Sequence, residues 1–539
     1  MNGARSRPTV LVRWAGGELR LPLGAGQSVR EVLDASTVRV RAACGGTGQC
    51  GACSVRLMGG AANPPTLAER QKLTPEERGA GARLACQLRP TEDIEVYVDG
   101  PAPESPWRAI PREDLAPVST GPVSAEGGRL GVAVDLGTTH LRVSLWDLHR
   151  GRRIATRRGP NPQQTFGADV LNRLGHALVS PTRSAELSNL VCASVVGALR
   201  DIVARDLGEG ARAFAEIGDV VVVGNTAMLT LLTERGAAAL LQPENWLSAV
   251  ECAPVDLRAW RARWPMPNAR LVLPGPIAGF IGSDLLAALV ATSLPRGPPG
   301  SLLLDIGTNT ELALWDGQTV HATSVPGGPA FEGAGVRFGM AAEPGAIYQV
   351  EAAAAGAPPS LRTVGGGEAR GYCGSGLVDA LALLRGDGRL KPSGRFAVAP
   401  GPEGVRLDPD VPRTAIFGAG VDAYQRAKAA IAAAMATLLG EAGLGWGDLR
   451  RVCVCGTFGR TLNLRNAQAT GLLPPVAPER FELHPEAALA GCELALRSTD
   501  PILGFDQVRD RVRPLNLGAH PGYDEGYVRH LRLEPIGGG

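Results

Sequence analysis

The stretch SLLLDIGTNTELALWDG, residues 301–317, decides the fold because it repeats an earlier stretch, GVAVDLGTTHLRVSLWDL at residues 131–148. Each copy is an apolar strand that ends in Asp-x-Gly-Thr. A turn follows, and then an alternating second strand that closes on Trp-Asp. An internal repeat of this kind predicts one duplicated α/β unit.

Both turns carry the groups that a magnesium–phosphate complex needs. Backbone amides and hydroxyls hold phosphate oxygens, while the carboxylate that ends the strand binds the metal through water. Glycine lets the backbone approach the phosphate closely. One such turn is more often an ordinary strand-to-helix turn, but two copies favour nucleotide binding. The predicted site has Asp135 and Asp305 as catalytic residues, and Gly137, Thr138, Thr139, Gly307, Thr308 and Asn309 as nucleotide-binding residues.

A later glycine corner supports this interpretation. In LRRVCVCGTFGR, residues 449–460, a buried strand runs into Gly456 and Gly459, on which a flat adenosine can rest. Together, the two turns and this corner resemble the superfamily of acetate and sugar kinases, heat-shock chaperones and actin. That resemblance implies two ribonuclease-H-like lobes that clamp ATP between them.

A cysteine cluster lies near the start of the chain, in CGGTGQCGAC at residues 44–53. Cys44, Cys50 and Cys53 follow a C-x5-C-x2-C pattern, and Cys86 lies 33 positions further on. Three thiolates on a loop and a fourth on a later strand can enclose a 2Fe-2S cluster. A structural zinc site is the alternative, but zinc sites usually offer two C-x2-C hooks and Cys86 has no second hook. The pattern resembles a 2Fe-2S ferredoxin domain over residues 1–98, with five residues where the plant-type spacing has four.

The segments around these motifs complete the expected organisation. Residues 8–33 indicate a strand, a Gly-Gly turn, a strand and a short helix, as in a β-grasp domain that closes with a strand near 93–100. A proline-rich linker follows. We therefore expect a multidomain α+β and α/β protein with an N-terminal β-grasp 2Fe-2S ferredoxin domain, a linker and duplicated ribonuclease-H-like ATPase lobes. The expected domains are the ferredoxin domain (1–98), the linker (99–128), a middle domain with the first ribonuclease-H-like segment (129–215) and a C-terminal ATPase domain (216–539) with its second phosphate turn from about residue 301.

Composition excludes several function classes. Lysine plus arginine (55) nearly balances aspartate plus glutamate (53), and no basic stripe indicates nucleic-acid binding. The start of the chain has no signal-peptide core and no stretch is long enough to span a membrane, so a cytoplasmic protein is expected. In that reducing compartment, clustered cysteines point to a metal or to redox chemistry. The remaining cysteines, scattered among apolar neighbours, are expected in the core: Cys192, Cys252, Cys373, Cys453, Cys455 and Cys492.

Further stretches narrow the resemblance. VVVVGNTAMLTLL (220–232), PGGPAFEGAGVRFGMAAEPGAI (326–347) and GYCGSGLVDALALL (371–384) are similar to the reductive activators of corrinoid-dependent methyltransferases, and the likeness extends over essentially the whole chain. It implies an enzyme that binds ATP and Mg²⁺ and passes one electron from its 2Fe-2S cluster to Co(II), giving Co(I). The implied partners are a corrinoid protein or cobalamin-dependent methyltransferase, an upstream electron donor and a second copy in a homodimer. The chain departs from the family pattern in IFGAGVDAYQRAKAAI and in LHPEAALAGC around His484, which puts the partner's identity in doubt.

Two other function classes remain open. In a redox sensor, the cluster would report oxidation state and the ATP lobes would act as a switch on a protein partner. The activase of a radical dehydratase also uses two ATP lobes, but it has no N-terminal ferredoxin domain.

Three further candidates lie outside these motifs. Lys428, on an alanine-rich helix at 426–439, is expected to extend outward from a buried helix rather than approach the nucleotide. Glu332, in a glycine-rich stretch, either faces magnesium or a catalytic water, or caps its loop. The seven histidines show no paired spacing, so we expect no metal site built from them.

Overall fold

The computed structural model describes most of the chain, with gaps at the N-terminus, around the cysteine loop and in the linker. The described residues are 8–34, 36, 38, 40, 48, 51, 53–99, 105–115, 129–167, 170–207, 212–327, 330–333, 335–342, 344–354, 357–456, 458 and 461–537.

The N-terminal domain is a mixed five-stranded sheet in the order β2-β1-β5-β3-β4. The hairpin of β1 (Thr9–Trp14) and β2 (Gly17–Pro22) is followed by α1 (Val29–Asp34), and β5 (Ile94–Tyr97) pairs in parallel with β1. This is the expected β-grasp order, and its core has residues of α1, Cys53 and Cys86. The domain's other elements are β3 (Ser54–Gly59), α2 (Leu67–Lys72), α3 (Pro75–Gly79) and β4 (Ala82–Leu84).

The first lobe is built on a sheet in the order β10-β9-β6-β7-β8. Strand β6 (Leu130–Leu136) is buried along its whole length, forms a hairpin with β7 (His140–Asp147) and pairs in parallel with β9 (Ile217–Gly224). The edges are β8 (Arg152–Pro160) and β10 (Arg270–Val272). The sheet of the first lobe therefore includes β9 and β10, which follow residue 216, the expected start of the C-terminal domain.

The second lobe repeats this arrangement in the order β20-β19-β11-β12-β13-β21. Strand β11 (Ser301–Ile306) forms a hairpin with β12 (Thr310–Trp315) and pairs in parallel with β19 (Arg451–Gly456). The outer strands are β13 (Val320–Val325), β20 (Phe481–His484) and β21 (Val512–Pro514). The corresponding strands of the two lobes share order and direction, so the predicted fold class with its duplicated lobes is confirmed.

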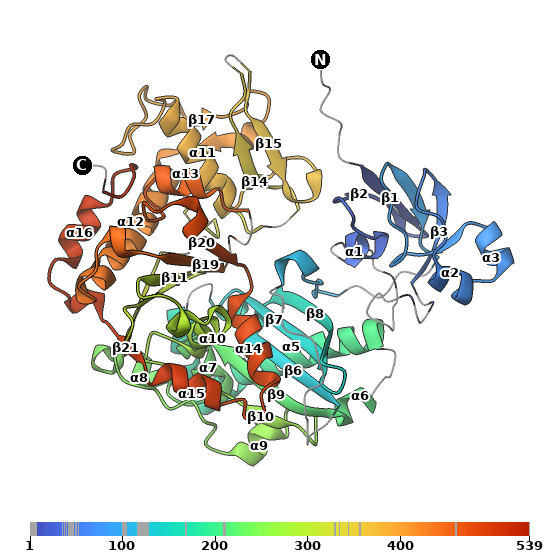
Figure 1. Ribbon diagram of the computed structural model, residues 1–539, viewed down its shortest axis with the longest axis horizontal. Coiled ribbons are helices and arrows are strands. Elements are labelled where there is room, and N and C mark those ends of the chain that lie inside the picture. Colours follow the sequence, from blue (N-terminus) through green and yellow to red (C-terminus); the bar gives the residue numbers. More distant parts are fainter. Residues whose placement is uncertain are drawn as a thin grey trace.

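Helices α10 (Ser283–Thr292) and α14 (Ala487–Leu496) lie between the two sheets (Figure 1). They share one core with Ala133 of β6 and Leu303 of β11, which joins the lobes across their inner faces. The outer face of the first sheet is covered by α5 (Pro181–Ile202) and α7 (Thr226–Thr233), and that of the second by α12 (Gly418–Glu441). Strands β6 and β11 therefore end close to the junction of the lobes.

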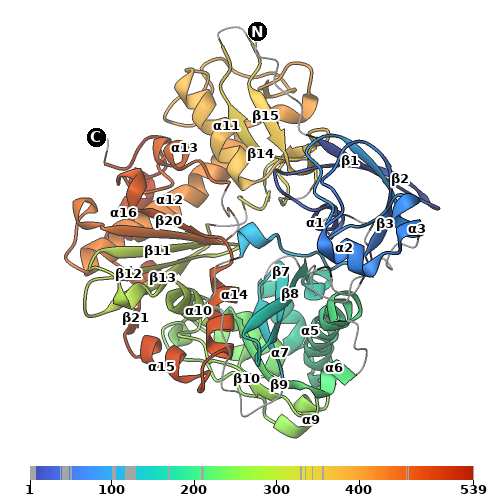
Figure 2. The ribbon, with the colours of Figure 1, turned by 45° about the vertical axis from the view of Figure 1, so that its right-hand side comes forward.

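A smaller subdomain stands on the second lobe, where β14 (Ala346–Glu351), β15 (Ser360–Thr363) and β16 (Gly371–Tyr372) form a sheet against α11 (Gly374–Gly386) (Figures 1 and 2). The remaining helices and strands are α4 (Val170–Leu178), α6 (Arg212–Ala215), α8 (Ala237–Leu240), α9 (Leu257–Arg261), α13 (Leu464–Ala469), α15 (Leu503–Arg509), α16 (Tyr523–Arg529), β17 (Val405–Arg406) and β18 (Ala415–Ile416).

The described part of the expected linker packs on the first lobe. Arg108 pairs with Arg158 of edge strand β8 through two backbone hydrogen bonds of 2.8 Å. The Trp107 side chain is buried against Gly159, where a Cβ atom would lie 2.6 Å from the indole ring. This segment thus contacts the edge of the first sheet through one isolated bridge, at Arg108.

Candidate functional site

The two Asp-x-Gly-Thr turns face each other across the junction of the lobes. The Thr139 hydroxyl, after β6, lies 2.9 Å from the Thr308 hydroxyl, after β11, although the two residues are 169 positions apart. Both hydroxyls donate to the carboxylate of Glu332, at 3.0 to 3.3 Å. The duplication therefore places two equivalent turns at one site.

Each turn is closed by a hydrogen bond from the N–H of its glycine, which spans three positions in the first turn and two in the second. The N–H of Gly137 donates to the carbonyl of His140 at 3.1 Å, and that of Gly307 donates to the carbonyl of Asn309 at 3.0 Å. A Cβ atom at Gly137 would lie 2.6 Å from the His140 oxygen, so that residue has to be glycine for the turn to stay closed. Neighbouring elements also fix the first turn, because Asn225 donates to the Thr138 hydroxyl at 2.6 Å and Arg173 donates to the Thr138 carbonyl at 2.8 Å.

Carboxylates gather beside the turns. Burial raises the pKa of Asp135, against the opposing effect of Arg142, and burial followed by the charge of Asp135 raises the pKa of Asp305 to about 7. Burial and the charges of Asp135 and Asp305 raise the pKa of Asp284, in the first turn of α10, to about 7. Mutual repulsion among carboxylates that are poorly solvated favours their protonated forms. A bound cation would remove that repulsion.

Arg142 is the counter-charge of this group. Its guanidinium lies 3.2 Å from Asp135 and also forms an ion pair with Glu486, just before α14. The carboxylates around it raise the pKa of Arg142, although burial alone would lower it.

Sequence reasoning missed Asp284, Arg142 and Glu486. A signal for Arg142 was available, because its position pairs with Asp135 in the β6–β7 hairpin. Glu486 falls in LHPEAALAGC, which was singled out only as a departure from the family pattern.

Gly456 lies where β19 ends, beside the second turn. Its φ is +87°, and a Cβ atom there would lie 2.5 Å from the Ile306 carbonyl and 2.6 Å from a carboxylate oxygen of Asp305. The glycine corner therefore touches the strand end that carries Asp305. Gly459 lies outside the described residues.

Two of the four predicted cluster ligands can be placed. Cys53 and Cys86 are buried, with 2% and 3% exposed surface, and the N–H of Ala85 donates to the carbonyl of Cys53 at 2.9 Å. A hydrogen bond from Cys86, together with burial, raises the pKa of the Cys53 thiol well above its usual range. Two adjacent buried thiols are donors of the kind that an iron–sulfur cluster uses, so the described residues fit this group. Cys44 and Cys50 lie outside the described residues.

The prediction for Lys428 was wrong. Its side chain is 1% exposed, and its ammonium group donates to the carbonyl of Arg532 instead of extending outward. Burial lowers the pKa of Lys428 to about 8, against the charge of Glu534. Lysine in this helix therefore anchors the C-terminal segment.

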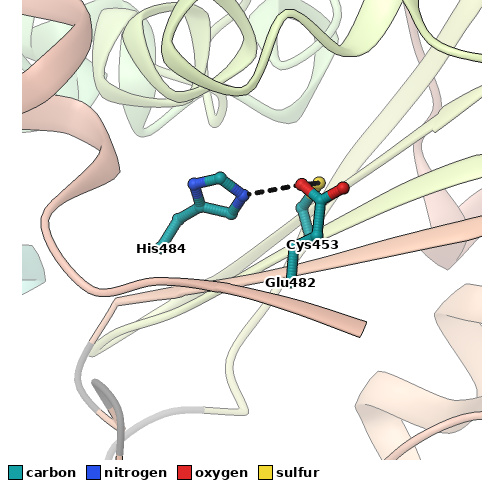
Figure 3. Close-up of side chains that lie close together, drawn as sticks. All are labelled: Cys453, Glu482 and His484. Carbon is teal, nitrogen blue, oxygen red and sulfur yellow. Dashed lines mark hydrogen bonds and ion pairs between the residues drawn. The ribbon is translucent and has the colours of Figure 1, made fainter. Parts of the chain in front are cut away.

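The structure brings Cys453, Glu482 and His484 together on strands β19 and β20, a group that the histidine spacing did not predict (Figure 3). Their potential ligand atoms lie within 4.8 Å of one another, and the His484 ring lies 3.0 Å from Glu482. However, Arg451 binds both carboxylate oxygens of Glu482, at 2.8 and 2.6 Å. Burial also raises the pKa of Cys453 to about 12, which disfavours the thiolate. Glu482 is therefore paired with Arg451 at this edge of the sheet.

The other cysteines outside the N-terminal domain are buried, as expected: Cys192, Cys252, Cys373, Cys453, Cys455 and Cys492. Among the described residues, one helical segment, Pro181–Leu207, is long and apolar enough to cross a membrane, but 56% of its most apolar window is buried in the protein. It includes α5, which packs on the first sheet as a core helix.

Comparison with known families gives matches along nearly the whole chain. The family described as the RACo middle region matches residues 130–297, and the one described as the C-terminal domain of RACo, the ASKHA domain, matches residues 300–536. The 2Fe-2S iron-sulfur cluster binding domain matches residues 12–91.

Characterised relatives are similar over most of their length. The chain is 28% identical to "Corrinoid activation enzyme RamQ" of Eubacterium limosum over 74% of this chain and 69% of the relative. It is 26% identical to the "[Co(II) methylated amine-specific corrinoid protein] reductase" of Methanosarcina barkeri, over 68% of this chain and 70% of that one. The solved structure "Reductive activator for corrinoid, iron-sulfur protein" has the same fold, with a TM-score of 0.63 and 24% identity over 98% of this chain and 99% of that chain.

Proposed function

Since the chain belongs to the RACo family of reductive activators, we propose that it reactivates a corrinoid protein, using ATP to drive the one-electron reduction of Co(II) to Co(I). The observation that carries the ATP part is the meeting of Thr139 and Thr308, because it brings two phosphate turns to one place. The relatives that are named for corrinoid activation and for Co(II) corrinoid protein reduction support the choice of substrate.

The nucleotide would bind between the lobes. Backbone amides and hydroxyls of the two turns would hold its phosphates, and the glycine corner that begins at Gly456 would contact the adenosine. Asp135 and Asp305 would bind Mg²⁺ through water, and the cation would offset the repulsion that raises the pKa of Asp305. Hydrolysis of ATP by water to ADP and phosphate would weaken these contacts, which would let the lobes separate.

The cluster would be held by Cys44, Cys50, Cys53 and Cys86. A bound 2Fe-2S cluster of this type supplies one electron, at a potential of about −400 mV. A corrinoid that has lapsed to Co(II) is harder to reduce than that. Because about 59 mV corresponds to about 1.4 kcal/mol for one electron, a gap of roughly 100 to 200 mV costs roughly 2 to 5 kcal/mol. A nucleotide-driven shift between conformations can supply that amount.

The proposal includes the cellular setting. We propose a cytoplasmic protein that works with an upstream electron donor and forms a homodimer, and whose immediate partner is a corrinoid protein or a cobalamin-dependent methyltransferase.

The proposal is tested with purified protein, a low-potential reductant and a Co(II) corrinoid protein, by following the absorbance of Co(I) with and without MgATP. In Asp135→Ala and Asp305→Ala, addition of MgATP should no longer increase Co(I) formation, and the colour of the cluster should be unchanged. A redox sensor would instead not couple ATP hydrolysis to repeated formation of Co(I). Equal yields of Co(I) with and without nucleotide would refute the role of ATP.

A further inference from the structure

The surface where the N-terminal domain meets the first lobe carries a buried network of charges. In both views the N-terminal domain lies beside the first lobe, with α1 at the junction (Figures 1 and 2). Arg30 of α1 forms an ion pair with Asp206, and Asp34 of α1 forms one with Arg205. These partners are more than 170 positions apart, so they join two separate units of the fold.

The lobe side of the network is a π-helical turn, η3 (Val203–Leu207), that continues from α5. It presents Arg205 and Asp206 next to each other, and π-helical turns are frequent at functional positions. Arg205 also donates to the carbonyl of Val40 at 2.8 Å. Asp206 in turn pairs with Arg157 of β8, which pairs with Asp201 of α5.

The network is balanced and dry. It contains three arginines and three aspartates, and the side chain of each member is less than 10% exposed. Although burial opposes it, the charges of Arg157, Arg30 and Arg205 lower the pKa of Asp206. A buried network of this kind adds little net stability, but loss of one partner leaves an uncompensated charge and is strongly destabilising. It therefore fixes one arrangement of the two units.

The network reaches the predicted cluster through α1. The N–H of Arg30 donates to the carbonyl of Ala85 at 2.9 Å, directly before Cys86. One arginine thus lies between the predicted ligands and the carboxylate of the first lobe.

We propose that these six residues form a docking latch between the N-terminal domain and the first lobe, with Arg30 as the positioning residue that couples the latch to the charge of the cluster. This rests on the proposed function only in requiring that the cluster binds. One-electron reduction adds negative charge beside Arg30 and strengthens its attraction, so reduction tightens docking and, reciprocally, docking favours the reduced cluster. The charged cluster domain is then held in place until the electron has left.

The latch is tested by amide hydrogen exchange in α1 and η3 of the full-length protein, oxidised or reduced with dithionite. Asp206→Asn leaves the N-terminal domain unchanged in sequence and should speed exchange in both segments by at least about tenfold. Arg30→Gln should do the same and abolish the difference between the oxidised and reduced states. Arg13→Gln, which removes exposed ion pairs with Glu18 and Glu95 of the same domain, is the matched control and should behave like wild type.

The midpoint potential of the cluster provides a second measurement. Arg30→Gln should shift the potential to more negative values, because it removes a positive charge that stabilises the reduced state, whereas Arg13→Gln should leave it unchanged. Wild-type exchange rates in Asp206→Asn would refute the latch, and identical exchange in oxidised and reduced wild type would refute the coupling. None of these measurements uses ATP or a corrinoid protein, so their failure is distinct from failure of the proposed function.

Discussion

At the residue scale, the buried carboxylates beside the two turns give the protein without bound nucleotide a particular pH dependence. Asp284 and Asp305 have a pKa of about 7 when folded, against an ordinary value of 3.8. Between these values the folded state binds more protons than the unfolded state, so stability falls as pH rises and the loss is complete above about pH 7.

We therefore predict that the melting temperature without nucleotide and in EDTA decreases from pH 5 to pH 8. Asp284→Asn should weaken this pH dependence and stabilise the protein at pH 8 by about 1 to 2 kcal/mol. One pKa unit corresponds to about 1.4 kcal/mol, and Asp135, Asp284 and Asp305 share their mutual repulsion. Thermal unfolding at several pH values measures this. An Asp284→Asn variant that keeps the full wild-type slope would contradict the assignment.

Gly456 carries a second prediction at this scale. Gly456→Ala should destabilise the protein by roughly 1 to 3 kcal/mol and weaken ATP binding, because the new methyl group would press on Ile306 and Asp305. Gly388→Ala is the control, since Gly388 has a similar φ of +78° but no atom within 4 Å of the added Cβ. Denaturant unfolding and nucleotide titration of both variants separate backbone strain from the clash. Equal behaviour of the two variants would count against the tight corner.

At the scale of elements, the ammonium group of Lys428 ties helix α12 to the C-terminal segment. Its pKa of about 8 when folded is below the ordinary 10.5, so between these values the unfolded state binds more protons and stability rises with pH. We predict that the melting temperature of the wild type increases relative to that of Lys428→Met from about pH 8 to pH 10. Buried thiols such as Cys453, whose raised pKa lowers stability in this range, are common to both proteins. The two pH windows do not overlap, so one set of melting curves tests both. A difference between the two melting temperatures that stays constant from pH 8 to pH 10 would contradict this role of Lys428.

Strands and turns were more predictable than the groups that surround them. The Asp-x-Gly-Thr repeat predicts two hairpins with equivalent turns. Strands β6–β7 and β11–β12 form these hairpins because the pattern is local, although the first turn is one residue longer than the second. Asp284 and Glu486 come from helices that reach the site only when the lobes pack together, so no local pattern marks them. The prediction for Lys428 was wrong for the same reason, because its partner Arg532 lies 104 positions away.

At the scale of the whole molecule, the electron-carrying domain and the nucleotide lobes have separate cores. We predict that Cys86→Ser lowers iron from about two per chain to nearly none and leaves MgATP hydrolysis intact, because the ligand lies in its own domain. Cys192→Ser, in the core of the first lobe, should leave iron unchanged. Iron analysis and phosphate release measure both effects. Loss of hydrolysis in Cys86→Ser would show that the two units are not independent.

A single-turnover experiment tests directly whether ATP drives electron transfer from the cluster to Co(II). Protein with a reduced cluster, freed of excess reductant, is mixed with a Co(II) corrinoid protein, and the absorbances of the cluster and of Co(I) are followed together. With MgATP, one Co(I) should form for each cluster that is oxidised; without it, or in Asp305→Ala, the cluster should stay reduced. Co(I) that forms to the same extent without nucleotide, or without oxidation of the cluster, would contradict the account.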